Sequence, residues 1–361
     1  MRTVAVGEAG PEPAPLFSVL IPSYNRPRQL VDAVSSVLAS RLADVEVLIS
    51  DDMSPRQPEI RDRLAPLLAD RRVRYIEQRV NLREPANRAF LASASRGQWL
   101  LYLGDDDRLE PEALDRLAGA IKGSPTADVF AFGYRLIDGR GLTRYSRRAP
   151  RQFSFSLESG AVFAEFMYSD AFPFWFYHPA SFCARRSVME RVVPNNEIGM
   201  GDDLLFLFDY VNTGGTVVVI PEVLMSYRKG SELEDTGAPN QSAADLANVV
   251  TRFKILQSLV LRSDLSPPMR AIVHADAFRD RFLFQAIINE DRDPLHIAKQ
   301  IGMPPDDLNA LALWAARRGR RVYRAIGFLR RVSVYVSMFG LLGILELVRT
   351  AGLRLVNARS R

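Results

Sequence analysis

Residues 17–27 have the sequence Phe-Ser-Val-Leu-Ile-Pro-Ser-Tyr-Asn-Arg-Pro, in which a short apolar run is followed by a polar turn that contains two prolines. An apolar run of this kind predicts a strand buried on both faces, as in a parallel sheet. Similar runs recur at residues 45–50, 73–77, 99–103 and 129–132. The first part of the chain is therefore expected to be built around these strands.

Segments with helical periodicity lie between the expected strands, at residues 28–39, 58–69, 85–95 and 111–122. Several carry a proline at or near the first turn, which is a helix-start signal. Repeated strand-helix-strand units predict right-handed crossovers and an open α/β sheet with helices on both faces. Residues 134–141, which end in Asp-Gly-Arg-Gly, predict a hairpin turn after the last of these strands.

The composition is that of a globular protein, because 47% of the 361 residues are hydrophobic and 25% are charged. Such values exclude a mainly disordered, collagen-like or coiled-coil chain. The single Cys183 excludes an internal disulfide, and no Cys/His cluster has zinc-site spacing, so a reducing, cytoplasmic compartment is expected. Residues 1–16 lack the pattern of a signal peptide and are expected to form a flexible leader.

Positive charge is concentrated in residues 317–361, which hold eleven Arg and one acid, a net charge of +10. The total of +5 then leaves residues 1–316 at −5, which argues against nucleic acid as a partner. Residues 332–348 are almost continuously apolar but short for a membrane span. An interfacial helix with a peripheral membrane contact through 317–354 is expected, and a buried helix or dimer contact is the alternative.

Polar or acidic residues follow three of the expected strands, at 22–27, 51–54 and 104–107. Ligands of open α/β sheets bind beyond the carboxyl ends of the strands, so these clusters mark the expected site. Grouped carboxylates repel one another unless a cation compensates them, and Mg²⁺ or Mn²⁺ carrying phosphates would do so. Capping of the next helix by Asp107 or Glu110 is the alternative interpretation of the third cluster.

The sequence resembles glycosyltransferase family 2, whose members have the GT-A fold and use nucleotide sugars. The resemblance covers residues 17–228 and rests on four ordered motifs: FSVLIPSYNRP, VLISDDMS, WLLYLGDDDRLEPEAL and GMGDDLLFLFDYVNTGG followed by VVVIPEVLMSYR. It implies an α/β, Rossmann-like nucleotide-sugar-binding sheet with an acceptor subdomain. The expected divisions are a leader (1–16), the nucleotide-sugar-binding half (17–133), the acceptor-binding half (134–230), a loop and helical region (231–316) and the basic, apolar C-terminal helix (317–361).

The resemblance assigns the nucleotide to the first strand-end loop and to the acids after the second strand. The matching positions are Pro22, Tyr24, Asn25, Asp52 and the adjacent Asp51. The Tyr24 ring can stack on a base, and the Asp52 carboxylate can accept an N–H from uracil or thymine. A UDP- or dTDP-sugar is therefore favoured as donor.

The Asp-x-Asp element of the family corresponds to residues 104–107, where Gly104 stands in place of an acid found in many members. The resemblance then implies that Asp105 binds ribose or metal, that Asp106 binds a divalent cation (Mn²⁺ or Mg²⁺), and that Asp107 is structural. Asp203 is the expected general base of an inverting transfer to a hydroxyl acceptor. Asp202 is the alternative base or a helix N-cap.

Many members carry a His after the stretch that matches 223–228, whereas this chain continues with Arg228 and Lys229. Either residue contacts the diphosphate or is a solvated charge. With membrane association, a glycan or lipid-linked acceptor at the inner face of the membrane is expected, in cell-surface polysaccharide or glycolipid biosynthesis. A non-catalytic binding module is one alternative function. A sugar nucleotidyltransferase is the other, although the Gly-rich, Arg-containing loop of such enzymes is absent.

Overall fold

The computed structural model describes residues 2–4, 14–147, 152–156, 181–191, 215–228, 261–265, 267 and 270. The elements up to residue 102 are β1 (Arg2–Val4), β2 (Phe17–Ser23), α1 (Pro27–Leu38), β3 (Val45–Asp51), α2 (Gln57–Leu64), β4 (Val73–Glu77), α3 (Glu84–Ala94) and β5 (Trp99–Tyr102). Those that follow are β6 (Arg108–Leu109), α4 (Ala113–Gly123), β7 (Val129–Ile137), β8 (Thr143–Arg147), β9 (Phe153–Ser156), β10 (Phe182–Arg185), α6 (Arg186–Met189) and β11 (Thr216–Arg228).

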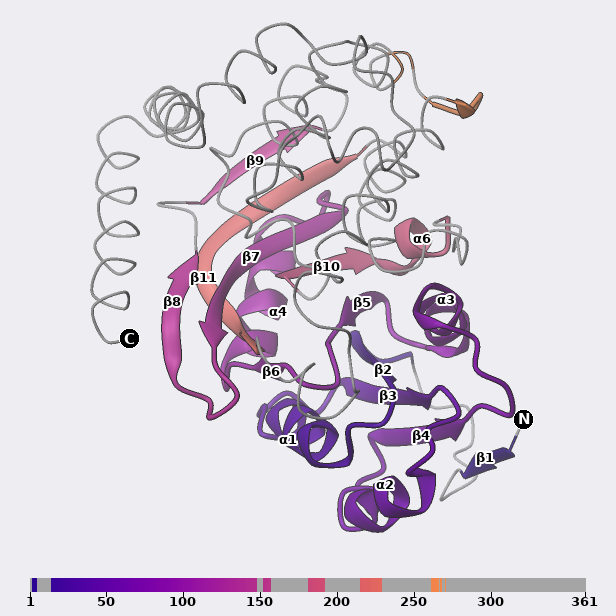
Figure 1. Cartoon of the computed structure of the whole chain (residues 1–361). Coiled ribbons are helices and arrows are strands. Elements are labelled where there is room, and N and C mark those ends of the chain that lie inside the picture. Colours follow the sequence, from indigo (N-terminus) through magenta and orange to yellow (C-terminus); the bar gives the residue numbers. More distant parts are fainter. Residues whose placement is uncertain are drawn as a thin grey trace, which may run out of the picture.

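One curved, mixed sheet contains all the described strands, in the order β1-β4-β3-β2-β5-β10-β7-β11-β6, with β8 beside β7 and β9 beside β11 (Figure 1). The neighbours β4, β3, β2 and β5 are parallel, as the apolar runs predict. α1 and α2 pack together, whereas α3 packs against β2 and β3. The step from β4 to β5 runs back across the sheet, so a right-handed crossover puts α3 on the opposite face from α1 and α2.

The strand expected at residues 129–132 is present as β7, but it is not hydrogen-bonded to β5. β10 lies between β5 and β7 and is antiparallel to both. β7 then pairs in parallel with β11, and in an antiparallel hairpin with β8. The hairpin confirms the expected turn, in which Gly141 has a φ of +80°, a value that glycine adopts without a steric cost.

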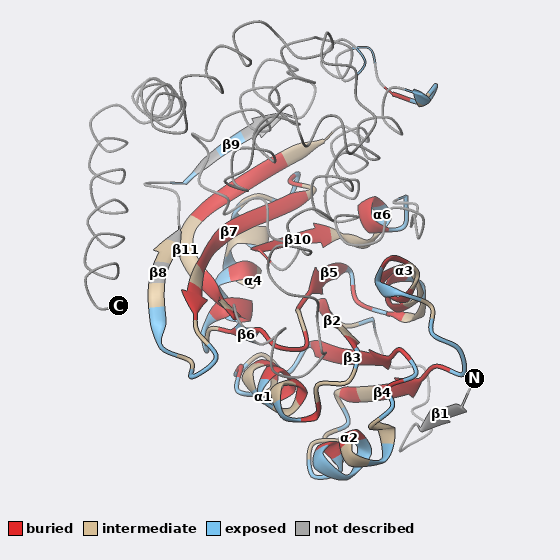
Figure 2. Cartoon of the chain, in the orientation of Figure 1, coloured by how far each residue is buried: buried red, intermediate tan, exposed pale blue. Residues whose placement is uncertain are grey.

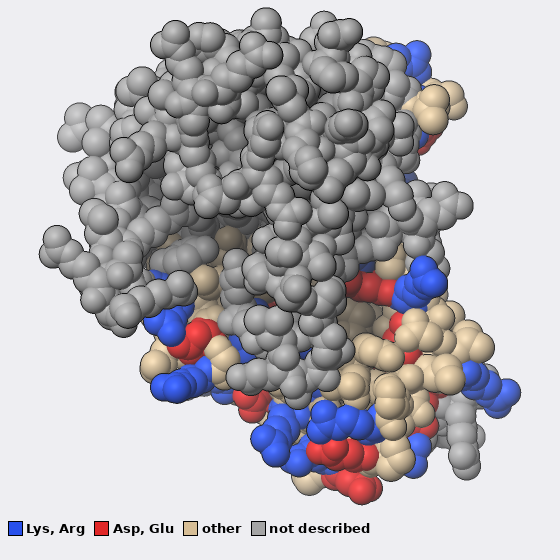
Figure 3. Space-filling view, viewed as in Figure 1, with Lys and Arg blue, Asp and Glu red and all other residues tan. Residues whose placement is uncertain are grey.

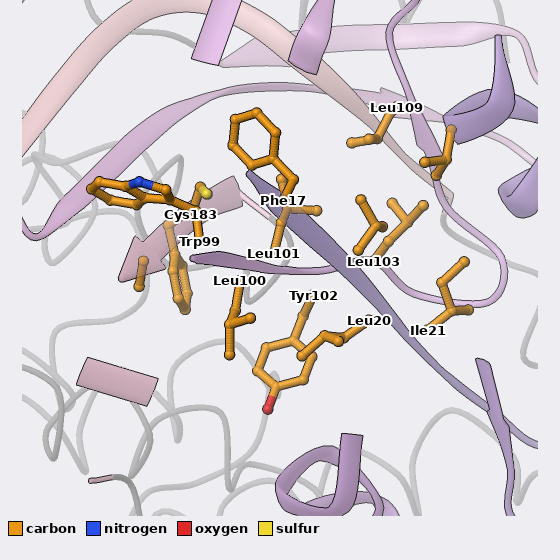
Figure 4. Close-up of a cluster of buried hydrophobic side chains, with 14 of the residues drawn as sticks. Phe17, Leu20, Ile21, Trp99, Leu100, Leu101, Tyr102, Leu103, Leu109 and Cys183 are labelled. Atoms are coloured by element: carbon orange, nitrogen blue, oxygen red, sulfur yellow. The ribbon is translucent and has the colours of Figure 1, made fainter. Parts of the chain in front are cut away.

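The hydrophobic core follows the strands, as Figure 2 shows by the buried residues along β2, β3, β5 and β7. Figure 4 shows part of it, where Phe17 and Leu20 of β2 lie beside Leu100 and Leu101 of β5. The Trp99 ring packs against Phe130, with ring centroids 5.4 Å apart, and so joins β5 to β7 across β10. The two halves of the sheet therefore share one core.

α1 shows why the amphipathic segments form helices on this sheet. Pro27 occupies its first turn, and its buried residues Leu30, Ala33, Val34 and Val37 recur at helical spacing.

The exposed surface near α2 is charged, with basic (blue) and acidic (red) side chains interleaved (Figure 3). Arg56 and Arg63 both pair with Glu59, at 2.9 and 2.8 Å. Exposed pairs of this kind contribute little to stability.

The leader expected at residues 1–16 is not wholly irregular. β1 pairs antiparallel with β4 and extends the sheet at that edge. The Trp99 amide donates to the Leu16 carbonyl at 2.9 Å, so the chain is anchored before β2 begins.

The described residues include no helix long and apolar enough to cross a membrane. The expected C-terminal helix at 317–361 lies outside these residues, as does most of 231–316.

A buried carboxylate fixes the sheet near the starts of β2, β3 and β4. Glu46 accepts hydrogen bonds from the Ser18 hydroxyl and the Arg96 amide and pairs with the Arg74 guanidinium. Burial by itself raises the pKa of Glu46, but these hydrogen bonds and the Arg74 charge together bring the pKa below its ordinary value. The ionised form of Glu46 is therefore favoured by folding.

Replacing Glu46 with Gln is expected to lower the free energy of unfolding by about 2 kcal/mol at pH 7.5, because charge-assisted hydrogen bonds are lost in a buried site. A carboxyl group whose pKa is lowered by folding stabilises above its unfolded pKa of about 4.3, and this contribution disappears as the pH falls through the folded value. Urea unfolding of wild type and Glu46→Gln at pH 7.5 and 3.5 measures the loss of stability at each pH.

Glu112→Gln, at an exposed ion pair with Arg116, is the control and should change stability by less than about 0.5 kcal/mol. A loss at Glu46 that is as large at pH 3.5 as at pH 7.5 would contradict the assignment.

Candidate functional site

The candidate site lies where β2 separates from β5. Pairing of β2 with β5 ends at Leu20 and Tyr102, whereas pairing with β3 continues to Ser23 and Asp51. Pro22 has no amide hydrogen with which to extend a ladder. The order of the parallel strands also reverses here, since β3 and β4 lie to one side of β2 and β5 to the other. Open α/β sheets bind ligands in the crevice at such a point.

Backbone strain is concentrated at the same edge. Among the described residues, the non-glycine residues with positive φ are Asn25 (60°), Met53 (61°) and Arg83 (67°). They lie in the loops that follow β2, β3 and β4 in turn. Left-handed backbone is unfavourable for residues other than glycine and is often retained where a loop binds a ligand. The three neighbouring loops therefore mark one candidate binding edge.

Asp51, predicted to bind the nucleotide, has both carboxylate oxygens hydrogen-bonded within the protein. One of its oxygens accepts the Ser54 amide at 2.9 Å, the other accepts the Tyr75 hydroxyl at 2.8 Å, and the residue is fully buried. Burial, aided by the Asp51 charge, raises the pKa of Tyr75, which therefore remains a donor. The Ser54 hydroxyl in turn accepts the Asn25 amide at 2.8 Å. Asp51 is thus a positioning residue that ties the loop after β3 to the loop after β2.

Asp52 is also buried but connects a different loop. Its carboxylate accepts the Leu82 amide at 2.6 Å, and its backbone carbonyl accepts the Asn81 side-chain amide at 3.1 Å. Burial raises the pKa of Asp52 above its ordinary value despite the Leu82 hydrogen bond. The loop after β4 is therefore fastened to the loop after β3.

Asp105 and Asp106 meet the loop after β2 through Arg26. The Arg26 Nη1 atom lies 2.8 Å from Oδ1 of Asp105 and 2.9 Å from Oδ2 of Asp106. The Tyr24 amide donates to the other oxygen of Asp105 at 3.0 Å. These acidic side chains are only 9% and 11% exposed. Arg26 is a site residue that sequence reasoning missed, although it lies in the polar turn that faces the acids.

Burial raises the pKa of Asp105 to about 6, and the nearby Asp106 charge adds to this, although the Arg26 charge opposes it. The pKa of Asp107 is raised well above its ordinary value for the same two reasons, burial first and Asp106 second. Raised carboxyl pKa values mean that the cluster favours neutralisation by a proton or by a cation.

Asp107 and Arg228 fix the loop that follows β5. The Arg228 amide donates to Asp107 Oδ1 at 2.9 Å, and the Arg228 guanidinium donates to the carbonyls of Asp106 at 2.9 Å and Gly139 at 3.2 Å. Arg228 is buried, so its interpretation as a solvated charge is wrong. Its guanidinium donates to backbone carbonyls and lies 3.7 Å from the Asp32 carboxylate, which argues against a diphosphate contact. The structural role of Asp107 is supported.

The capping interpretation of the acidic cluster is wrong. α4 has no side-chain cap at its first residues. Glu110 instead accepts the Ser226 hydroxyl at 2.7 Å and so contributes to the link between β6 and β11. Asp107 and Glu110 therefore bond to β11 rather than to the first turn of α4.

Gly104 explains why this chain departs from the family motif. A Cβ atom at this position would lie 2.8 Å from Asp107 Oδ2 and 3.2 Å from Asp106 Oδ1. An acid at residue 104 cannot fit unless these carboxylates move. The neighbouring Asp107 carboxylate fills the space that a side chain at 104 would need.

The residues present fit a divalent cation that carries phosphates. Asp105 and Asp106 each direct an oxygen at the same cationic atom, Arg26 Nη1. A divalent cation held between these two carboxylates would neutralise their charge in the same way. Carboxylate oxygens are the ligands that Mg²⁺ and Mn²⁺ prefer. The described residues contain no group of three or more His, Cys, Asp or Glu arranged around a metal position. Phosphate and water would have to complete the shell, and the expected Asp202 and Asp203 lie outside the described residues.

Comparison with known proteins agrees with this geometry. Residues 18–193 match the family described as Glycosyl transferase family 2. Residues 18–193, just under half of the chain, are therefore similar to members of that family. The succinoglycan biosynthesis protein ExoO of Rhizobium meliloti is 25% identical to this chain over 225 residues, which cover 60% of this chain and 62% of ExoO. An uncharacterized glycosyltransferase of Haemophilus influenzae is 29% identical, over 36% of its own length, so the chain matches less than two thirds of either relative.

Solved structures support the fold of this chain. TarS of Staphylococcus aureus superposes with a TM-score of 0.53 at 15% identity, over 88% of this chain and 91% of the TarS chain. The mannosyltransferase PcManGT of Pyrobaculum calidifontis, solved with GDP-Man and Mn²⁺, superposes with a TM-score of 0.52 at 14% identity, over 94% and 87%. The expected GT-A fold is confirmed.

Replacing Gly104 with Ala is expected to lower the free energy of unfolding by about 1–3 kcal/mol, because the new methyl group overlaps the fixed Asp107 carboxylate. In an Asp107→Ala background the same change should cost much less. Chemical denaturation of the four proteins in this double-mutant cycle measures the coupling.

Gly119→Ala is the matched control, since a Cβ there meets no atom within 4 Å and lies in the interior of α4. It should raise the free energy of unfolding by about 0.5–1 kcal/mol. Additive effects of Gly104→Ala and Asp107→Ala would refute the packing explanation.

Proposed function

We propose that this chain is an inverting, metal-dependent glycosyltransferase of family 2. It moves a sugar from a nucleoside diphosphate sugar, with a UDP- or dTDP-sugar favoured, to a hydroxyl acceptor. The observation that carries the proposal is the meeting of Arg26, Asp105 and Asp106 at the point where the parallel strands reverse order. Buried acids that favour neutralisation at this point suit a diphosphate bound with a cation.

The nucleoside end of the donor would lie over the loops that follow β2, β3 and β4. Tyr24, Met53 and Val80 in these loops are exposed by 43%, 51% and 61%, and are three of the five large apolar side chains exposed among the described residues. A flat base can pack against such surfaces. The buried Asn25 Oδ1 has no hydrogen-bond partner within the described residues and could accept a donor N–H or O–H. Asp52 would accept an N–H of the base.

Asp105 and Asp106 are the residues that would hold the divalent cation, Mn²⁺ or Mg²⁺. When bound, such an ion acts as a Lewis acid that neutralises charge on the departing diphosphate. Before a ligand binds, Tyr24 and Arg26 orient Asp105 by the two hydrogen bonds that its oxygens accept. Arg228 and Asp107 fix the loop on which both acids lie.

Asp203 would act as the general base, an assignment that rests on the sequence. Its carboxylate takes the proton of the acceptor hydroxyl while that oxygen forms a bond to the anomeric carbon. The bond from that carbon to the diphosphate oxygen breaks in the same step, and the nucleoside diphosphate leaves with the electron pair. A single displacement of this kind inverts the anomeric centre.

The acceptor is proposed to be a glycan or lipid-linked glycan in cell-surface polysaccharide or glycolipid biosynthesis. The relative from Rhizobium meliloti is described as a succinoglycan biosynthesis protein, which supports this class. The eleven arginines of residues 317–361 and the apolar run at 332–348 support a peripheral contact with the inner face of the membrane.

Release of nucleoside diphosphate from a panel of nucleotide sugars, with Mn²⁺, Mg²⁺ or EDTA, tests the donor half. One donor is expected to give slow, metal-dependent release, and Asp106→Asn should abolish it. With an acceptor present, Asp203→Asn should lower kcat by about 10²–10⁴-fold because the general base is lost, and donor binding measured by calorimetry should persist.

Asp115→Asn on the exposed side of α4 is the control for a surface carboxylate and should leave release unchanged. Release that is insensitive to EDTA would refute the metal assignment. Absence of nucleotide binding across the panel would refute the transferase proposal and favour a non-catalytic module.

The membrane contact predicts that the full chain sediments with vesicles containing anionic lipid and that a chain ending at Ala316 does not. Raised salt should release the full chain, because arginines near an anionic surface act through a screened electrostatic attraction. Equal sedimentation of the two chains would show that residues 317–361 do not mediate binding.

A further inference from the structure

The position of Arg26 raises a question that the proposed function leaves open. Its Nη1 atom lies within 2.9 Å of one oxygen from each of Asp105 and Asp106. Those are the two carboxylates that a divalent cation would use. A guanidinium group and a metal ion cannot occupy the same position between the same oxygens.

The ion pair is shielded from water. The Arg26 side chain is 16% exposed and the acids are 9% and 11% exposed. Charge-assisted hydrogen bonds in such surroundings are stronger than surface pairs. The loop also leaves the guanidinium close to the acids, since Tyr24 donates to Asp105 and Leu30 donates to the Arg26 carbonyl at 3.0 Å, where α1 begins. Displacing Arg26 therefore opposes metal binding.

We propose that Arg26 is a resident counter-ion that competes with the divalent cation for Asp105 and Asp106, an inference that rests on the metal-dependent function proposed above. In the absence of donor, Arg26 keeps the two acids paired and holds the metal affinity low. When a nucleoside diphosphate binds, its phosphate oxygens offer the guanidinium another anionic partner. Arg26 thereby couples metal binding to donor binding.

The coupling follows from linkage. A ligand that stabilises the displaced position of Arg26 must strengthen metal binding by the same factor by which the metal strengthens binding of that ligand. A side chain that cannot compete removes both effects together. Arg26 is thus a positioning residue that acts on the site through the two acids.

The test measures Mn²⁺ affinity directly, by calorimetry or electron paramagnetic resonance, in the full-length protein with and without UDP. Arg26→Gln should bind Mn²⁺ alone about tenfold or more tightly than wild type, since a competing charge-assisted interaction is absent. Addition of UDP should tighten Mn²⁺ binding more in wild type than in Arg26→Gln. Arg26→Lys keeps the charge but not the planar fork, and should fall between them.

Arg74→Gln is the matched control, because it removes one Arg from a buried carboxylate, Glu46, near the start of β4. It should leave Mn²⁺ affinity within about twofold of wild type. Thermal unfolding and circular dichroism establish that each variant is folded. If Arg26→Gln does not fold, Arg26→Lys provides the measurement.

Equal or weaker Mn²⁺ binding by the Arg26 variants, with binding intact in wild type, overturns the competition and leaves the metal-dependent function standing. Failure of wild type and variants alike to bind Mn²⁺, even with UDP, overturns the competition and the metal assignment together. Tighter binding in Arg26→Gln with an unchanged UDP effect supports the competition for the empty site and refutes the coupling.

Discussion

Buried negative charge at the end of β5 is the constraint around which the described structure is arranged. Asp105 and Asp106 are largely removed from water. In such surroundings like charges repel strongly, and each charge must have a partner. The partner available without a ligand is Arg26, which the parallel pairing of β2 with β5 brings to the same edge. The arrangement of the sheet therefore determines which charges can compensate the acids.

The second half of the sheet prevents the acids from moving away from one another. β11 runs parallel to β7 and ends at Arg228, whose amide and guanidinium hold Asp107 and the Asp106 carbonyl. Gly104 leaves room for the Asp107 carboxylate to fold back into the same loop. Repulsion within the cluster thus cannot be relieved by relaxation of the loop. A fixed cluster of acids of this kind would suit the cation proposed for the site.

The sequence was sufficient for the parallel strands, because each is a short apolar run whose burial on both faces leaves a clear pattern. β10 was not predictable in the same way, since Phe182–Arg185 is too short to be distinguished from any other core segment. Asp105 and Asp106 were expected from their motif, but the inward turn of Asp51 toward Tyr75 depends on a partner on another strand. Arg26 was missed for the same reason: an arginine in a polar turn looks solvent-exposed until the fold places two buried acids beside it.

Formal charge gives a reason why metal and donor should arrive together. Asp105, Asp106 and Arg26 sum to one negative charge, and a divalent cation alone would change that to one positive charge in a site with little solvent. A nucleoside diphosphate sugar carries two negative charges on its phosphates, so binding both ligands restores the ligand-free value. Neither ligand alone restores the formal charge of the ligand-free site. Arg26 makes this balance possible, because it can remain in the site and exchange a carboxylate partner for a phosphate one.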